Sequence, residues 1–241
     1  MILSRAQLED IGAAVINDFC GSIDGQFSAI DIDRLASDYL KLHVSFTRLS
    51  EDGSLCGITA YADTEFRLDC GGYVKTIPLM QNQVLLDSSF IEPSQCHKLC
   101  GKRRFTLSHE CAHHILFQLE TDEEKAACRR LYSARHAYSL RDLKTKEDWN
   151  EWQANVLGAA ILMPPQLIDF LMFRMACSRR LVCYGNYFNY QDRMSLNNIC
   201  RFLGVSKTAL VIRLRELDFI EDKPYTEYRD PLEVWNEESD L

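Results

Sequence analysis

The segment RFTLSHECAH, residues 104–113, is the most informative part of the sequence. Its second half contains two histidines, His109 and His113, in the pattern HExxH. On a helix, side chains four residues apart lie on the same face, so both imidazoles can reach one ion about 2.0–2.1 Å from each ring nitrogen. Apolar residues recur around the motif at helical spacing, so the sequence predicts a helix over 104–118 that presents part of a metal site.

The glutamate of the motif, Glu110, is expected beside the metal rather than on it. One step along a helix is a rotation of about 100°, so Glu110 points to the side of His109. Zinc lowers the pKa of a bound water from about 15.7 towards about 7, and Glu110 would accept its proton as the water attacks a peptide carbonyl. The competing interpretation, two half-buried histidines held by hydrogen bonds, stays open because HExxH arises by chance in roughly one chain per hundred of this length.

A third ligand is needed to complete the site. The metzincin pattern would place Gly at 116 and His at 119, whereas the sequence has Leu116 and Leu119, so that class is excluded. The favoured ligand is Glu151, on a long apolar helix predicted over 148–163 that carries small residues suited to close helix packing. Asn155, one turn further along, could accept the free ring N–H of a zinc-bound histidine.

Other candidates for the third ligand follow the motif more closely in sequence. Glu120, Glu123 and Glu124 come too soon after the first helix to fold back over it, which favours a solvated turn. His136 lies in a polar, loop-like segment. For Glu151 itself, the alternative is an exposed carboxylate favoured by the dipole at the start of its helix.

Three segments together resemble the ImmA/IrrE family of zinc metallo-endopeptidases. They are RFTLSHECAH at 104–113, EWQAN at 151–155 and AILMP at 160–164. The family's usual pattern is R-F-T-L-[AS]-H-E-x-x-H, followed by E-x-x-A-N and by a helix that ends in L-M-P. The resemblance implies a zincin-like fold and proteolytic activity.

The resemblance also implies roles for individual residues. His109, His113 and Glu151 would be the zinc ligands, and Glu110 would be the general base. Family members typically cleave a helix-turn-helix repressor at a specific site and so switch on mobile-element, phage or stress genes. In zincins an extended substrate adds to the edge of the sheet above the metal, and residues 83–86 are the expected edge strand.

Two positions depart from the family's pattern. Cys111-Ala112 stands where the family often has Leu-Gly, and His114 follows the second histidine where an apolar residue is common. Neither position is expected to touch the metal. We expect Cys111 to be a small core residue and His114 to lie at the surface.

The rest of the chain predicts an α+β, zincin-like metallopeptidase with a small antiparallel sheet. The expected helices are 5–19, 30–40, 123–132 and 166–175, the expected strands are 42–46, 57–61, 65–68 and 83–86, and 183–191 is an aromatic-rich connection. We place a metallopeptidase domain at residues 1–180. A helical C-terminal module with an acidic tail follows at 181–241.

The C-terminal module is similar to a helix-turn-helix. Residues 195–203 and 207–217 carry apolar residues at helical spacing around Gly204, and Ser206 is the expected N-cap of the second helix. Its basic residues could bind DNA. The net charge of −8 and the acidic tail favour packing or partner recognition instead.

The amino-acid composition limits which classes of protein the chain can belong to. The 241 residues are 46% hydrophobic and 10% aromatic, which excludes wholesale disorder. No stretch approaches the roughly 20 apolar residues of a membrane span, and the start lacks the apolar core of a signal peptide. The ten cysteines are scattered, as expected of small core hydrophobes in a reducing cytosol. We therefore expect a cytoplasmic protein without a membrane partner.

Two secondary points stay open. Cys96 and Cys100 have the spacing of half a metal site, but no second Cys/His pair matches them. The residue that would stabilise the oxyanion is not identified, and four candidates are named by type alone: Tyr132, His136, Tyr138 and Tyr184.

The favoured function is a zinc endopeptidase of narrow specificity that cleaves a transcriptional repressor. The first alternative is a DNA-binding or partner-binding regulator with a structural or vestigial metal site, although a purely structural site needs no Glu110. The second is the peptidase half of a toxin–antitoxin-like pair, an interaction protein regulated by complex formation. Two histidines and one glutamate favour zinc, while manganese and iron stay open.

Overall fold

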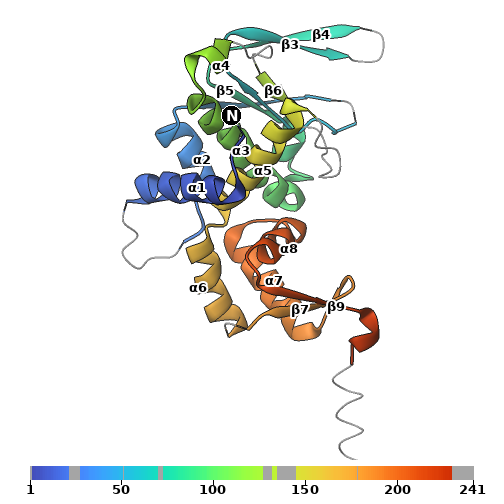
Figure 1. Cartoon of the computed structure of the whole chain (residues 1–241). Coiled ribbons are helices and arrows are strands. Elements are labelled where there is room, and N and C mark those ends of the chain that lie inside the picture. Colours follow the sequence, from blue (N-terminus) through green and yellow to red (C-terminus); the bar gives the residue numbers. More distant parts are fainter. Residues whose placement is uncertain are drawn as a thin grey trace, which may run out of the picture. The chain divides into compact units, whose positions relative to one another are not determined.

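The computed structural model describes residues 2–21, 28–50, 52–69, 73–126, 132–134, 145–177 and 179–229. The chain divides into two compact units, Met1–Pro164 and Pro165–Leu241, and Figure 1 labels their elements. The boundary predicted from the sequence lies after residue 180. Helix α6 (Pro165–Ala176) therefore belongs to the first predicted domain but to the second compact unit. The extent of an independently folding domain therefore stays a prediction.

Three long helices frame the first unit (Figure 1). α1 spans Arg5–Cys20, α3 spans Cys96–Gln118 and α5 spans Lys146–Leu162. α5 packs against both α3 and α1. α1 and α5 each start with a capping box, in which the hydroxyl of Ser4 or Thr145 accepts a backbone N–H of the first turn. The sequence therefore fixes where these two helices begin.

Four strands form a mixed sheet in the order β1-β5-β2-β6. Their bounds are His43–Thr47 for β1, Gln83–Asp87 for β5, Gly57–Ala60 for β2 and Tyr132–Ala134 for β6. β1 and β5 are parallel, and β2 is antiparallel to both of its neighbours. The expectation of a purely antiparallel sheet is therefore wrong, because the chain between β1 and β5 is long enough to form the crossover that parallel strands need.

The predicted edge strand, residues 83–86, lies inside the sheet. β5 pairs with β1 on one side and with β2 on the other, and Val84, Leu85 and Leu86 are buried. A continuous apolar run is typical of an internal strand that is covered on both faces, whereas an exposed edge strand shows alternation. Within the described part of this sheet, the edge strands are β1 and β6.

A separate hairpin, β3 (Thr64–Asp69) with β4 (Val74–Leu79), packs on the main sheet through a shared apolar cluster. That cluster comprises Leu49, Leu55, Ile58, Ala60, Phe66, Leu68, Ile77, Leu79 and Leu85. β4 was not among the strands predicted from the sequence. Its first three residues are all exposed, and it contains Pro78. Both features hide the alternation on which strand prediction relies.

The shorter helices differ in part from expectation. α2 (Ile32–Arg34) continues into a π-helical turn at Leu35–Tyr39, so the helix predicted over 30–40 is present but irregular. α4 spans Asp122–Ala126. The prediction of a helix as far as residue 132 is wrong, because Tyr132 begins β6.

The helix that carries the HExxH motif is longer than predicted. α3 begins at Cys96, shortly after a 3-10 turn at Ser88–Ile91, rather than at residue 104. Its first turns are mostly polar and partly exposed, so they lack the apolar stripe that marks the rest. Cys96 and Cys100 thus lie near the start of this helix.

The second unit combines α6 with a small three-stranded sheet and two further helices. β7 (Leu181–Tyr184) lies between β8 (Tyr187–Phe188), which is antiparallel to it, and β9 (Ile220–Lys223), which is parallel to it. A 3-10 turn follows at Tyr225–Glu227. The segment 183–191 is therefore a hairpin rather than a plain connection, and its two short strands are too brief to leave a pattern.

α7 (Tyr190–Leu203) and α8 (Lys207–Glu216) are joined by a turn at Gly204. The glycine has φ 62° and ψ 40°, the left-handed conformation that glycine adopts without strain. The predicted cap is confirmed, since the Ser206 hydroxyl accepts the backbone N–H of Ala209 at 3.2 Å. The role of this helix pair as a DNA-binding motif stays a prediction.

None of the helices in the described ranges is long and apolar enough to cross a membrane alone. The consecutive helical segments 148–162 and 165–176 pass that test only as a bent pair, on length and composition.

Candidate active site

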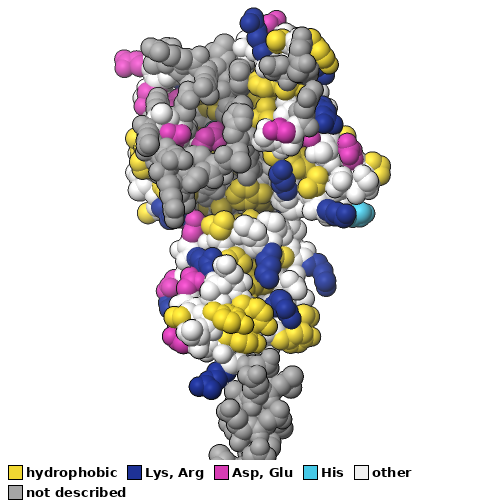
Figure 2. All heavy atoms as spheres, turned by 90° about the vertical axis from the view of Figure 1, so that its right-hand side faces the viewer, with side chains coloured by type: hydrophobic (Ala, Val, Ile, Leu, Met, Phe, Trp, Pro, Cys, Tyr) yellow, Lys and Arg dark blue, Asp and Glu magenta, His cyan; other side chains and the backbone are white. Residues whose placement is uncertain are grey.

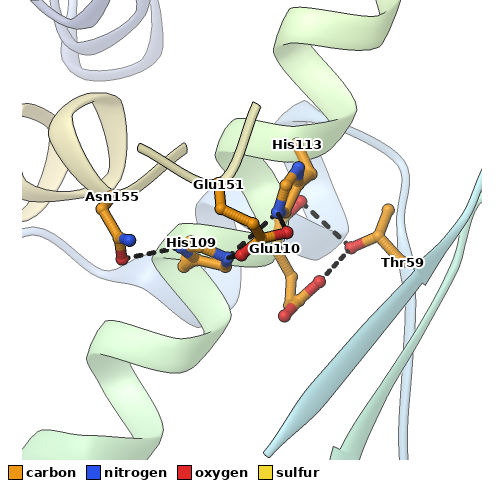
Figure 3. A network of polar contacts seen from close by, with 6 residues as sticks. All are labelled: Thr59, His109, Glu110, His113, Glu151 and Asn155. Atoms are coloured by element: carbon orange, nitrogen blue, oxygen red, sulfur yellow. Dashed lines mark hydrogen bonds and ion pairs between the residues drawn. The ribbon is translucent and has the colours of Figure 1, made fainter. Parts of the chain in front are cut away.

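Two helices of the first unit bring four polar side chains together (Figure 3). α3 supplies His109 and His113, and α5 supplies Glu151 and Asn155. Glu151 Oε2 lies 3.2 Å from His109 Nε2, and Glu151 Oε1 lies 3.0 Å from His113 Nε2. The two histidine Nε2 atoms are 3.0 Å apart. The side chains predicted as metal ligands therefore converge from separate segments.

The approach of α3 to α5 depends on a glycine and a serine. A Cβ atom at Gly158 would lie 3.1 Å from the backbone nitrogen of His109 and 3.2 Å from its Cα. The hydroxyl of Ser108, which is fully buried, donates to the carbonyl oxygen of Gly158 at 2.8 Å. The expectation of close packing through small residues is confirmed, and the helices cross at the level of the first histidine.

Asn155 determines which ring nitrogen of His109 carries the proton. Its Oδ1 lies 3.0 Å from His109 Nδ1, and an amide oxygen can only accept, so Nδ1 donates. The Nε2 atom of the neutral ring then presents a lone pair towards the carboxylate of Glu151 and the second imidazole. Electron-rich atoms this close repel one another unless a shared proton or a metal cation lies among them.

The spacing of the three ligand atoms fits a small divalent ion. A tetrahedral ion with bonds of about 2.0–2.1 Å holds its ligand atoms about 3.4 Å apart. The observed separations between Nε2 and carboxylate atoms are 3.0–3.2 Å. In the part of the chain that the structure describes, His109, His113 and Glu151 form the one group of three His, Cys, Asp or Glu side chains arranged for a metal ion.

Burial and charge act in opposite directions on Glu151. The side chain is 21% exposed, against 0% for His109 and 4% for His113. Burial alone raises the pKa of the Glu151 carboxyl, but the hydrogen bonds of the two histidines, and their charges when they are protonated, outweigh it and hold that pKa well below its ordinary value. Glu151 is therefore ionised near neutral pH, which is the form that a metal ligand requires.

Glu110 is fully buried beside the histidines and contacts strand β2. The hydroxyl of Thr59 lies 2.7 Å from Glu110 Oε2, to which it donates, and 3.2 Å from the backbone oxygen of the same residue. Figure 3 shows both contacts on the side of Glu110 away from Asn155. Sequence reasoning selected Glu110 but missed Thr59, because a contact between residues so far apart in the chain has no local signal.

Two arginines fix the first half of α3 to the segment around α2. Arg103 forms two hydrogen bonds of 2.7 Å with the carboxylate of Asp33, and Arg104 donates to the carbonyl oxygen of Ile30 at 2.7 Å. The hydrogen bond from Arg103 holds the pKa of Asp33 below its usual range. Arg104 is the first residue of the RFTLSHECAH segment. Its contact with Ile30 gives it a structural role that was not predicted from the sequence.

The two positions that depart from the family's pattern have different outcomes. Cys111 is fully buried, and burial raises the pKa of its thiol far above the ordinary value, as expected of a core residue. The expectation that His114 lies at the surface is wrong. Only 7% of it is exposed, and burial lowers its pKa. The reason is that α3 is buried on every face from Thr106 to Ile115.

The remaining candidates whose side chains the structure describes do not join this group. Glu123 is exposed, and the carboxylate of Glu124 accepts the backbone N–H of Thr121 at 3.0 Å; both residues lie in the short helix α4 rather than in the expected turn. Cys96 and Cys100 are free thiols. His136, Tyr138 and the side chain of Tyr132 lie outside the described residues, and Tyr184 belongs to β7 in the second unit.

Comparison with known families agrees with this geometry. The family model described as the IrrE N-terminal-like domain, Peptidase_M78, matches residues 97–215, about half of the chain. The matched range contains both histidines of the HExxH motif as well as Glu151 and Asn155. No curated protein matches the chain. The chain belongs to the ImmA/IrrE peptidases, the M78 family defined by the IrrE N-terminal-like domain.

Proposed function

We propose that this chain is a zinc-dependent endopeptidase of narrow specificity. His109, His113 and Glu151 would hold the ion, and Glu110 would be the general base. The observation that carries the proposal is the convergence of two imidazole nitrogens and one carboxylate within 3.0–3.2 Å of one another. A buried carboxylate, that of Glu110, comes from the same helix.

The chemistry divides between the ion and the side chains. When bound, zinc would polarise the substrate carbonyl and make water more acidic. Glu110 would take a proton from the attacking water and deliver it to the leaving amine, so that no covalent acyl-enzyme forms. Asn155 would keep His109 in the tautomer whose Nε2 faces the ion. Zinc is favoured over manganese because imidazole donors suit it better, and over iron(II) because nitrogen and oxygen sites of this kind generally bind Zn²⁺ more tightly than Fe²⁺.

The proposed substrate is a helix-turn-helix transcriptional repressor encoded nearby, cleaved in the cytoplasm. This part rests on what family membership implies, namely proteolysis of a protein substrate. The C-terminal pair α7–α8 would then serve packing or substrate recognition. Three of its exposed basic residues, Arg193, Arg201 and Lys207, support a second candidate, a DNA-binding regulator. Figure 2 shows Lys and Arg side chains on the surface of the second unit beside exposed hydrophobic ones.

Co-expression with the neighbouring repressor tests the proposal. We expect the wild type to cleave the repressor, and Glu110→Gln to bind zinc in equal amount while its cleavage rate falls by about 10²- to 10⁴-fold. Glu123→Gln, an exposed acid on α4, is the matched control and should cleave normally. Equal cleavage by Glu110→Gln would remove the assigned base. A selective DNA mobility shift by a zinc-loaded protein that cuts nothing would favour the regulator.

A further inference from the structure

Strand β2 separates two environments by the alternation of its four residues, all of which are buried. Ile58 and Ala60 belong to the apolar cluster shared with the β3–β4 hairpin. Gly57 and Thr59 alternate with them and contact Glu110 on α3. One strand therefore supports the core with one face and the acidic residue of the HExxH motif with the other.

Thr59 contributes a hydrogen bond to the carboxylate of Glu110. The distance of 2.7 Å between Thr59 Oγ1 and Glu110 Oε2 is that of a strong bond to a charged acceptor. Both side chains are 0% exposed, so bulk solvent does not weaken the bond between them. The contact to the backbone oxygen of Glu110, at 3.2 Å, is longer, and a hydroxyl has only one proton to donate. The carboxylate is therefore the principal acceptor.

Gly57 contributes space for the same carboxylate. A Cβ atom at this position would lie 2.5 Å from Glu110 Oε1 and 2.9 Å from its Cδ. It would also lie 2.9 Å from the Cγ2 atom of Thr106, so an added methyl group would clash with two side chains of α3. The glycine is required by this close approach of a side chain to the strand backbone.

We infer that Thr59 and Gly57 are positioning residues that hold the Glu110 carboxylate in its reactive place, one by a hydrogen bond and the other by the absence of a side chain. The inference rests on the proposed function, in which Glu110 takes a proton from the attacking water and therefore has to be held in a defined position. Neither residue touches the group of His109, His113 and Glu151 in the contacts described above. Their loss should therefore affect turnover and leave metal binding intact.

Variants at Thr59 separate the hydroxyl from the rest of the side chain. Thr59→Val keeps the shape and removes the donor, whereas Thr59→Ser keeps the donor and removes a methyl group. Ile58→Val is the matched control, since it removes a methyl group from the opposite face of the same strand. The assay is steady-state cleavage of one peptide that a mixed library and mass spectrometry identify as a substrate, together with zinc content and crystal structures of the zinc-loaded variants.

We expect Thr59→Val to lower kcat by about 10- to 100-fold with KM and zinc content unchanged. Thr59→Ser and Ile58→Val should stay within about threefold of the wild type. Gly57→Ala should resemble Thr59→Val. Unchanged kcat in Thr59→Val, or an equal loss in Thr59→Ser, would overturn the inference, because the hydroxyl would then not matter.

The crystal structures keep this test separate from that of the proposed function. If the zinc-loaded wild type cleaves no peptide and no repressor, the proposed function fails. The position of the Glu110 carboxylate still decides the inference: displacement away from β2 in Thr59→Val and retention in Thr59→Ser would support it. An unmoved carboxylate in Thr59→Val would overturn it.

Discussion

Helix α3 contacts two neighbours at the candidate site, and each supports a different part of the chemistry. On the α5 side, Glu151 and Asn155 reach the histidines through charged and hydrogen-bonding side chains. On the β2 side, Glu110 is held by one hydroxyl and by a missing Cβ. The metal side is thus built from side chains, whereas the base side depends on one hydroxyl and on the close approach of the β2 backbone. The two sides should therefore fail in different ways.

Removing the carboxylate from the α5 side should have the largest effect. Glu151→Ala deletes one of three donors, so we expect zinc affinity to fall by at least about 100-fold and hydrolysis to disappear with it. Zinc content after dialysis, compared with that of Glu110→Gln, measures this. A Glu151→Ala protein that keeps stoichiometric zinc would show that the donor group is not the metal site.

Asn155→Ala should have an intermediate effect on the same side. The amide oxygen orients the His109 ring, and its loss should weaken zinc binding by about 10- to 100-fold while leaving the fold intact. Asn155→Asp supplies an acceptor in the same place and should recover most of the affinity. Competition with a zinc chelator gives both values. Equal affinity in Asn155→Ala and the wild type would assign Asn155 no role in metal binding.

Helical periodicity explains why the metal side was accessible from sequence. His109 and His113 are one turn apart, as are Glu151 and Asn155, so each pair reveals a shared helix face before any tertiary contact is known. The remaining step was to pair the helix that carries the histidines with the helix that carries Glu151. The small residue Gly158 indicated where close packing could occur, and the structure places it against His109.

The base side offered no comparable signal. β2 was predicted as a strand, but its neighbours in the sheet and the helix it faces are set by long-range packing. The same limit explains the misplaced edge strand: residues 83–86 gave a correct strand, yet its position between β1 and β2 depends on a parallel pairing that no local pattern encodes. The prediction of a surface position for His114 was wrong for the same reason, since its burial depends on which elements cover α3.

Gly158 on α5 and Gly12 on α1 allow packing at the site to be compared with packing away from it. A Cβ at Gly158 meets the backbone of His109 at 3.1 Å, whereas a Cβ at Gly12 on α1 meets the Cβ of Ala160 at 2.9 Å. Overpacking costs about 1–3 kcal/mol, and the helix propensity of alanine offsets up to about 1 kcal/mol of it. We therefore expect both alanine variants to lose up to about 2 kcal/mol in urea unfolding.

The two variants should differ in zinc affinity. Backbone atoms of His109 cannot yield to a new methyl group as a side chain can, so Gly158→Ala should displace α3 and weaken zinc binding several-fold. Gly12→Ala should leave it unchanged, because α1 carries no ligand. The reverse pattern would mean that the distance between α3 and α5 does not control the site.

The smallest effect is expected where α3 is anchored away from both sides of the site. The hydrogen bond from Arg103 depresses the pKa of Asp33, so the stability that this pair contributes is present above the unfolded-state pKa of about 3.9 and is lost as the pH falls through the lower folded-state value. Asp33 is 50% exposed, which limits the contribution to under about 1 kcal/mol. Asp33→Asn should therefore be less stable than the wild type at pH 7 and should approach it in stability near pH 3, in urea unfolding of the metal-free proteins. A stability gap that stays constant across this pH range would rule out the ion pair as its cause, and any change in zinc content would show that the anchor reaches the site after all.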